Sequence, residues 1–174
     1  MRRTILFWSI VAICVLGVFT VADKASARTL DMSWPHNDRS WPVVMVQNDT
    51  HTADFPVARA VRAWGAPLHY GHCVIGRGCV HVKEVHWGNN GVVGKTTLNP
   101  NSSYQIKSVT IQMNRYYSRT RDHNFTLQGM LHELGHSMGL DHDTGIGVMG
   151  SGVDGRHTHI SNYERQELRG LYHV

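Results

Sequence analysis

Short runs in which hydrophobic positions dominate or alternate with polar ones occupy the middle of the chain. They span residues 42–47 (PVVMVQ), 79–85 (CVHVKEV) and 106–113 (IKSVTIQM), with a weaker run at 91–98 (GVVGKTTL). Alternation and β-branched residues are typical of half-buried β-strands. The turn-forming sequences GNNG and NPNSS lie between the later runs. The pattern therefore predicts several strands that pair into a sheet.

Three other segments repeat their hydrophobic residues at helical spacing. The first is expected to be capped by Asp54, with Pro56 in its first turn, and to end at Gly65. The second is expected to begin near Asn124 or Thr126. The apolar faces of these two helices consist of Val57, Ala60, Val61 and Trp64, and of Leu127, Met130, Leu131 and Leu134.

A last helix is predicted at the C-terminal end of the sequence. SNYE, from Ser161 to Glu164, is a capping box, and Leu168, Leu171 and Tyr172 follow at helical spacing. With 41% hydrophobic and 17% charged residues, the chain has the composition of a globular protein. Strands followed by helices predict a single α+β domain with about three helices.

The first 27 residues have the pattern of a secretory signal peptide. Arg2 and Arg3 precede an apolar run, residues 5–22, and ASA ends at Ala27. We expect cleavage after Ala27, which leaves residues 28–174 as the mature, secreted domain. The alternative is an uncleaved membrane anchor, because 18 mostly apolar residues nearly span a bilayer.

Charge and cysteine content agree with an extracellular protein. Residues 28–174 contain 14 basic and 12 acidic residues without Lys/Arg blocks, so neither nucleic acid nor a membrane surface is an expected partner. Two cysteines remain, and we expect a disulfide between Cys73 and Cys79, because thiols outside the cell usually pair. The alternative is a metal site formed by these cysteines with His72 and His81.

The sequence HELGHSMGLDH, residues 132–142, combines histidines at a spacing suited to metal binding. His132 and His136 are four residues apart, so a helix places both imidazoles on one face. A helix continued to His142 would separate it from His132 by about 15 Å, so the chain must turn back before it. Gly139 stands where a helix-ending turn is needed.

Glu133 follows the first histidine and lies about 100° away from it around the helix. That position lets its carboxylate reach a water beside the metal without competing for the ion. We therefore expect one catalytic zinc ion held by His132, His136 and His142, with Glu133 as general base. His157 and His159 alternate nearby and are either a second metal site or, as we prefer, solvated loop residues.

Residues 132–142 resemble the HExxHxxGxxH motif of the metzincin zinc metalloproteases. Met149, in GIGVMGSG, resembles the methionine of the Met-turn, a hydrophobic floor beneath the metal. The order of elements over residues 42–174 is most similar to the matrixins, the matrix metalloproteinase type. The resemblance implies a twisted mixed sheet and an active-site helix followed by the Met-turn.

The sequence departs from the matrixin pattern at several places. Asp143 follows the third histidine where matrixins usually have serine, and no PRCGxPD-like cysteine switch precedes the domain. Residues 85–107 lack the His/Asp/Gly pattern of structural zinc and calcium sites, so neither ion is expected. Gly150 and Ser151 follow Met149, so the tyrosine of astacin-like enzymes is absent.

These features predict a secreted, monomeric zinc endopeptidase. Water activated by zinc and by Glu133 would hydrolyse the peptide bond of a protein or peptide bound along the sheet edge as an added strand. No stable membrane association is expected after signal cleavage. The alternative is a zinc-stabilised binding or adhesion module without proteolytic activity. Glu133 favours the enzyme, because a module that needs only the metal has no use for a base.

Overall fold

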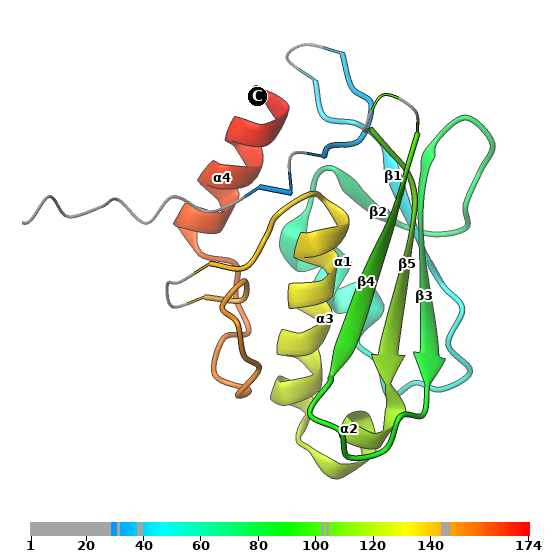
Figure 1. The fold of residues 1–174 in the computed structure, drawn as a ribbon, viewed down its shortest axis with the longest axis vertical. Helices are drawn as coiled ribbons and strands as arrows, with labels where there is room; N and C mark the ends of the chain where they lie inside the picture. Colours follow the sequence, from blue (N-terminus) through cyan, green and yellow to red (C-terminus); the bar gives the residue numbers. More distant parts are fainter. Residues whose placement is uncertain (1–28, 31, 38–39, 102, 104, 144–146) are drawn as a thin grey trace, which may run out of the picture.

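The four predicted strands and one further strand, β2, form one five-stranded mixed sheet in the order β2-β1-β3-β5-β4 (Figure 1). The computed structural model describes residues 29–30, 32–37, 40–101, 103, 105–143 and 147–174, so the predicted signal peptide lies outside the described residues. Neighbouring strands are parallel except for β4, which is antiparallel to β5 and forms one edge of the sheet. The strands are β1 (Val44–Asn48), β2 (Leu68–Tyr70), β3 (Gly78–Val85), β4 (Gly94–Pro100) and β5 (Ile106–Asn114).

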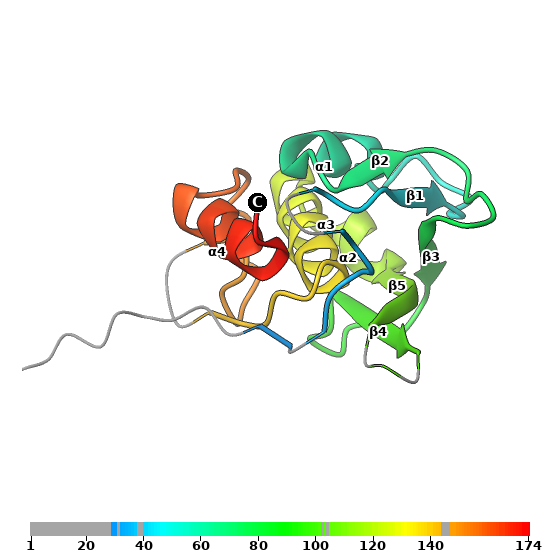
Figure 2. The same cartoon turned by 90° about the horizontal axis from the view of Figure 1, so that it is seen from above.

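The described residues contain four helices, one more than the sequence pattern predicts. They are α1 (Val57–Trp64), α2 (Arg115–Thr120), α3 (His123–Ser137) and α4 (Asn162–Tyr172). The unpredicted elements, α2 and β2, are 6 and 3 residues long, too short to show a hydrophobic period. The α+β prediction is confirmed, with α1 and α3 against one face of the sheet and α4 beyond α3 (Figure 2).

One predicted helix start was wrong, and a second was close to the observed start. Pro56 is the N-cap of α1, without a side-chain cap, while the Asp54 carboxylate lies 3.6 Å from Arg119 of α2. Helix α3 begins at His123, close to the predicted Asn124, because the side chain of Asp122 accepts a hydrogen bond from the backbone N–H of Phe125. The capping box of α4, by contrast, is formed by Ser161 and Glu164 as predicted.

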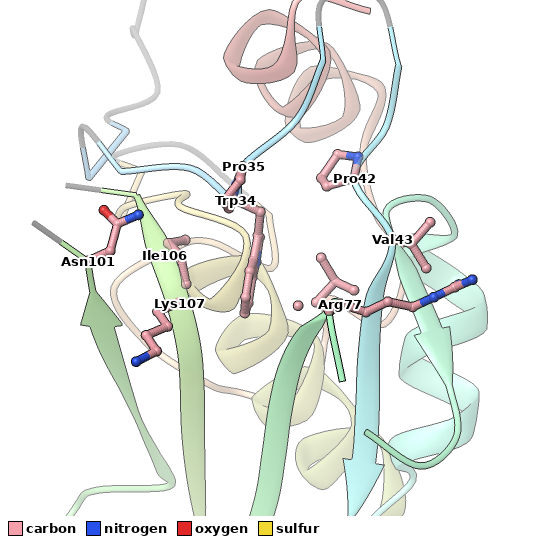
Figure 3. Close-up of a pocket in the computed structure, with 11 residues that line it drawn as sticks. Trp34, Pro35, Pro42, Val43, Arg77, Asn101, Ile106 and Lys107 are labelled. Atoms are coloured by element: carbon pink, nitrogen blue, oxygen red, sulfur yellow. The ribbon is translucent and has the colours of Figure 1, made fainter. Parts of the chain in front are cut away.

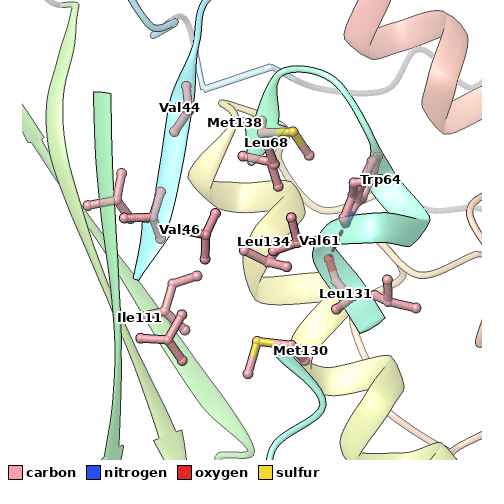
Figure 4. Packing of buried hydrophobic residues seen from close by; sticks show 14 of the residues in the cluster. Val44, Val46, Val61, Trp64, Leu68, Ile111, Met130, Leu131, Leu134 and Met138 are labelled. Atoms are coloured by element: carbon pink, nitrogen blue, oxygen red, sulfur yellow. Dashed lines mark hydrogen bonds between the residues drawn. The ribbon is translucent and has the colours of Figure 1, made fainter. Parts of the chain in front are cut away.

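The hydrophobic core fills the space between the sheet and α3 (Figure 4). Alternate residues of the strands, such as Val44, Val46 and Ile111, face the apolar side of α3. Trp64 of α1 is buried as well, and its indole N–H donates to the backbone oxygen of Leu131 at 2.9 Å. This contact fixes α1 against the helix that contains the first two histidines.

The segment before β1 packs against the C-terminal end of α3. The Trp34 side chain is only 1% exposed, and its indole N–H donates to the backbone oxygen of Ser137 at 2.8 Å. The backbone N–H of Leu30 donates to the oxygen of Gly139. The start of the described chain therefore supports the turn that leads to His142. No helix among the described residues is long and apolar enough to cross a membrane.

Candidate metal centre

Helix α3 ends after its second histidine, as the spacing predicts. The helix runs to Ser137, Met138 is its C-cap, and Gly139 has a φ of 94°. Other residues rarely adopt this left-handed conformation. A side chain at Gly139 would also overlap the backbone oxygen of Met32. Glycine therefore allows both the reversal of the chain and the close approach of the preceding segment.

The turn brings the three histidines of the motif together. The Nε2 atom of His132 lies 3.0 Å from that of His136 and 3.1 Å from that of His142. The Nε2 atoms of His136 and His142 are 3.3 Å apart. Three nitrogens about 2.0–2.1 Å from a tetrahedral zinc ion would be separated by roughly 3.3 Å, so the triangle has the dimensions of a zinc site.

Backbone carbonyls determine which ring nitrogens face the centre of this triangle. The Nδ1 atom of His132 lies 2.7 Å from the oxygen of Val148, and that of His136 lies 2.8 Å from the oxygen of Leu140. A carbonyl oxygen only accepts, so both Nδ1 atoms must be the protonated ones. Each neutral ring then directs an Nε2 lone pair inward. Lone pairs at 3.0 Å repel one another, and a cation between them would relieve that repulsion.

Burial also favours the neutral, metal-binding form of the first two histidines. Desolvation, assisted by the nearby imidazole of His136, lowers the pKa of His132 to about 4. Desolvation likewise lowers the pKa of His136. Metal binding requires the unprotonated imidazole, so these two rings are preorganised for it at neutral pH. His142 is exposed and completes the site from the solvent side.

Met149 packs against α3 at Gly135, between the first two histidines. Its sulfur would overlap any Cβ placed on Gly135, so the glycine of HELGH makes room for the methionine. The oxygen of the preceding Val148 is the acceptor that orients His132. The buried carboxylate of Glu164 accepts hydrogen bonds from the backbone N–H groups of Met149 and Ser161 at 2.9 and 2.7 Å. The capping glutamate of α4 thus also fixes the turn beneath the histidines.

Glu133 lies beside the triangle and lines the same cleft, which has a volume of about 450 Å³. Its side chain is almost fully buried, and Oε2 accepts a hydrogen bond from the Thr96 hydroxyl at 2.6 Å. Burial raises the pKa of Glu133 to about 7, against the opposing effect of Thr96. A carboxyl group that titrates near neutral pH is suited to accept a proton and to return it.

The edge strand β4 forms one wall of the cleft, and residues 151–153 form another. Gln128 of α3, which the sequence analysis did not single out, holds the second wall. Its buried amide donates to the oxygen of Gly152 and accepts from the N–H groups of Asp154, Gly155 and His157 at 2.7–3.3 Å. Its position four residues before His132, on the same face of α3, was the only sequence signal for this role.

A second group of possible ligands lies at the start of β3, the central strand of the sheet. The sulfur atoms of Cys73 and Cys79 are at disulfide distance, with their Cα atoms 5.5 Å apart, and His81 is beside them. Among the described residues, only this group and the histidine triangle bring three possible ligand atoms within 4.8 Å. His72, His157 and His159 belong to neither group.

A larger cavity lies away from the histidine triangle, beside the loop that joins Cys73 to Cys79 (Figure 3). It has a volume of about 490 Å³ and lies between the segment around Trp34, the start of β3 and the start of β5. Arg77 and Lys107 extend from opposite sides of it, so their charges do not converge on one point. The smaller cleft, which contains the histidines and Glu133, is the one equipped for chemistry.

Neither the models of known protein families nor the curated proteins contain a match to this chain.

Proposed function

We propose that the protein is a zinc-dependent endopeptidase of the metzincin type, with a compact, matrixin-like catalytic domain. The single observation that supports this most directly is the convergence of three Nε2 atoms beside a buried carboxyl group in an open cleft. Three protein nitrogens leave one zinc position for water or substrate, which distinguishes catalytic from structural zinc. The secreted state of residues 28–174 is part of the same proposal.

His132, His136 and His142 fit a zinc ion by number and spacing, and the first two also by tautomer. Bound there, zinc would supply an acidified water and a Lewis acid for the scissile carbonyl. Glu133 takes one proton from the attacking water and returns it to the leaving amine. The proton count balances, because one water adds across one peptide bond and Glu133 ends as it began.

The substrate class follows from the position of β4. Strand β4 pairs with β5 along one edge only, so its other edge has no neighbouring strand among the residues that the structure describes. Residues 94–96 of β4 line the cleft. An extended peptide added along this edge would pass the histidines and would be held by backbone hydrogen bonds. A protein or peptide chain is therefore the substrate we propose.

A zinc-stabilised binding module remains the second candidate function. It is favoured only by the metal ligands, whereas the carboxyl group of Glu133 in the cleft has a role only in the enzyme. The two functions differ in one measurement, which is turnover at full zinc occupancy.

The test is hydrolysis of casein or gelatin by the mature, zinc-loaded protein. We expect cleavage that stops with a chelator and returns with added zinc. Glu133→Ala should retain zinc but hydrolyse about 10² to 10⁴ times more slowly, the usual contribution of a positioned acid/base. Glu167→Ala, a glutamate of α4 outside the cleft, is the matched control and should behave as the parent. A Glu133→Ala variant as active as the parent at equal zinc content would contradict the mechanism.

A further inference from the structure

The edge strand β4 touches the general base as well as bordering the cleft. The Thr96 hydroxyl lies 2.6 Å from Oε2 of Glu133 and 3.0 Å from the backbone oxygen of the same residue. The hydroxyl has one hydrogen, and an ionised carboxylate is the stronger acceptor. Thr96 therefore donates to Oε2 while Glu133 is ionised, and the other carboxylate oxygen stays available for a proton.

A second residue of the same strand shapes the space for this carboxyl group. Gly94 lies two positions before Thr96, on the same face of β4. A Cβ at Gly94 would lie 2.7 Å from Cγ, 2.8 Å from Oε1 and 2.9 Å from Cδ of Glu133. Its partner in β5, Met113, and that of Thr96, Ile111, are both buried in the core. Both positions of β4 thus face α3 and enclose the Glu133 side chain.

We propose that Thr96 is a positioning residue for the general base, acting through its hydrogen bond to Glu133 with the space left by Gly94. The inference rests on the proposed peptidase function and deepens it. The hydroxyl limits rotation of the carboxyl group by holding Oε2 against β4. Glu133 accepts the proton of the attacking water on its other oxygen and passes it to the leaving amine, and Thr96 keeps its own proton throughout. The strand that binds the substrate then also aligns the base.

A purely structural role for Thr96 makes a different prediction. Its contact with the backbone oxygen of Glu133 would join β4 to α3 whatever side chain stood at position 133. Removing the hydroxyl would then affect the fold, zinc content and substrate binding together. Positioning predicts instead an effect on kcat alone that disappears once the Glu133 carboxylate is absent.

The experiment is a double-mutant cycle in the mature zinc protein. Thr96→Val keeps the shape of the side chain but removes the donor, and Thr96→Ser keeps the donor. Thr110→Val, at a half-buried position of β5 outside the cleft, is the matched control. Each variant is made in the parent and in Glu133→Ala, and zinc content, Tm, kcat and KM on a fluorogenic peptide are measured, with single-turnover rates for the slow variants.

We expect Thr96→Val to lower kcat roughly 10- to 100-fold with KM and zinc content unchanged, since a hydrogen bond to a charged group is worth about that factor. Thr96→Ser should restore most of the rate, and Thr110→Val should match the parent. In the Glu133→Ala background, Thr96→Val should have no further effect.

Two results would overturn the positioning role while leaving the proposed function intact. One is a Thr96→Val variant with the kcat of an active parent. The other is an equal loss from Thr96→Val with and without the Glu133 carboxylate. Absence of hydrolysis by the zinc-loaded parent would instead contradict the proposed function, and the role of Thr96 would be rejected with it.

Discussion

The histidine triangle and the cysteine group at β3 each bring three possible metal ligands within 4.8 Å, but their ligand atoms have different partners. In the triangle, carbonyls take the Nδ1 hydrogens of His132 and His136, so the Nε2 lone pairs face one another. In the second group, the two sulfur atoms are at disulfide distance from each other. Proximity of ligand residues therefore does not define a metal site, because the lone pairs must also be free.

The two groups differ in burial as well. His132 is only 6% exposed, whereas Cys73, Cys79 and His81 are all half-buried. Desolvated neutral ligands gain more from a cation than hydrated ones do. We therefore expect zinc to bind at the triangle alone.

The largest effect should come from removing one ligand of the triangle. His142→Ala should weaken zinc binding by more than about 100-fold, beyond the loss typical of an outer-shell partner. His142 is the suitable ligand to remove, because it is exposed and its loss leaves the core intact. Zinc affinity is measured by competition with a chromogenic chelator, and folding by circular dichroism.

His81→Ala is the control for that measurement, since it removes the histidine of the other group. It should retain one zinc per chain with the affinity of the parent. If His81→Ala lost zinc while His142→Ala retained it, the assignment of the two groups would be reversed.

Local spacing explains why the triangle was predictable from the sequence. His132 and His136 follow from the helical period, and Gly139 follows from the need to turn within six residues. The disulfide-distance pair was predictable for a similar reason, because Cys73 and Cys79 are close in the chain.

The supporting contacts were not predictable, because each joins segments far apart in the chain. Thr96 reaches Glu133 across 37 positions, Gln128 reaches the loop at Gly152 across 24, and Glu164 reaches Met149 across 15. Only the fold brings these residues together. Asp54 shows the same limit, because its preference for a helix cap loses to an ion pair with Arg119, a residue of the unpredicted α2.

The second prediction concerns pH and the buried histidine. The pKa of His132 is lowered to about 4 in the folded protein, from about 6.5 when unfolded. The unfolded chain binds the extra proton first, so stability is lost as pH falls from about 6.5 towards 4. The loss is on the order of 3 kcal/mol for metal-free protein.

Glu133 opposes this loss, because burial raises its folded pKa to about 7 and its neutral form is favoured at low pH. Its contribution to stability is present below about 4.5 and is lost as pH rises through 7. Metal-free Glu133→Gln should therefore lose more stability on acidification than the parent does. Denaturant unfolding at pH 7 and pH 4.5 measures the difference. Equal losses in both proteins would show that Glu133 is not buried as described.

The third prediction concerns the cysteine pair, which should contribute to stability rather than to metal binding. Replacing both Cys73 and Cys79 by serine should lower the free energy of unfolding by about 2 kcal/mol, the value for closing so short a loop. Zinc content should stay at one per chain. Peptide mapping without reductant that found both thiols free, or uptake of a second zinc by the oxidised parent, would contradict this assignment.

The smallest effect should come from the ion pair beside the cysteines. Asp49 accepts from Nδ1 of His81 at 2.7 Å, much as Val148 accepts from His132. If this contact oriented His81 towards a metal, Asp49→Asn would weaken zinc binding by about 10- to 100-fold. Because both side chains are partly exposed and water screens their charges, we expect instead a stability change below about 1 kcal/mol and unchanged zinc affinity. Chelator competition on Asp49→Asn decides between weakened and unchanged zinc affinity. A hydrogen bond at Nδ1 orients a metal ligand only where the other ring nitrogen directs its lone pair at the ion.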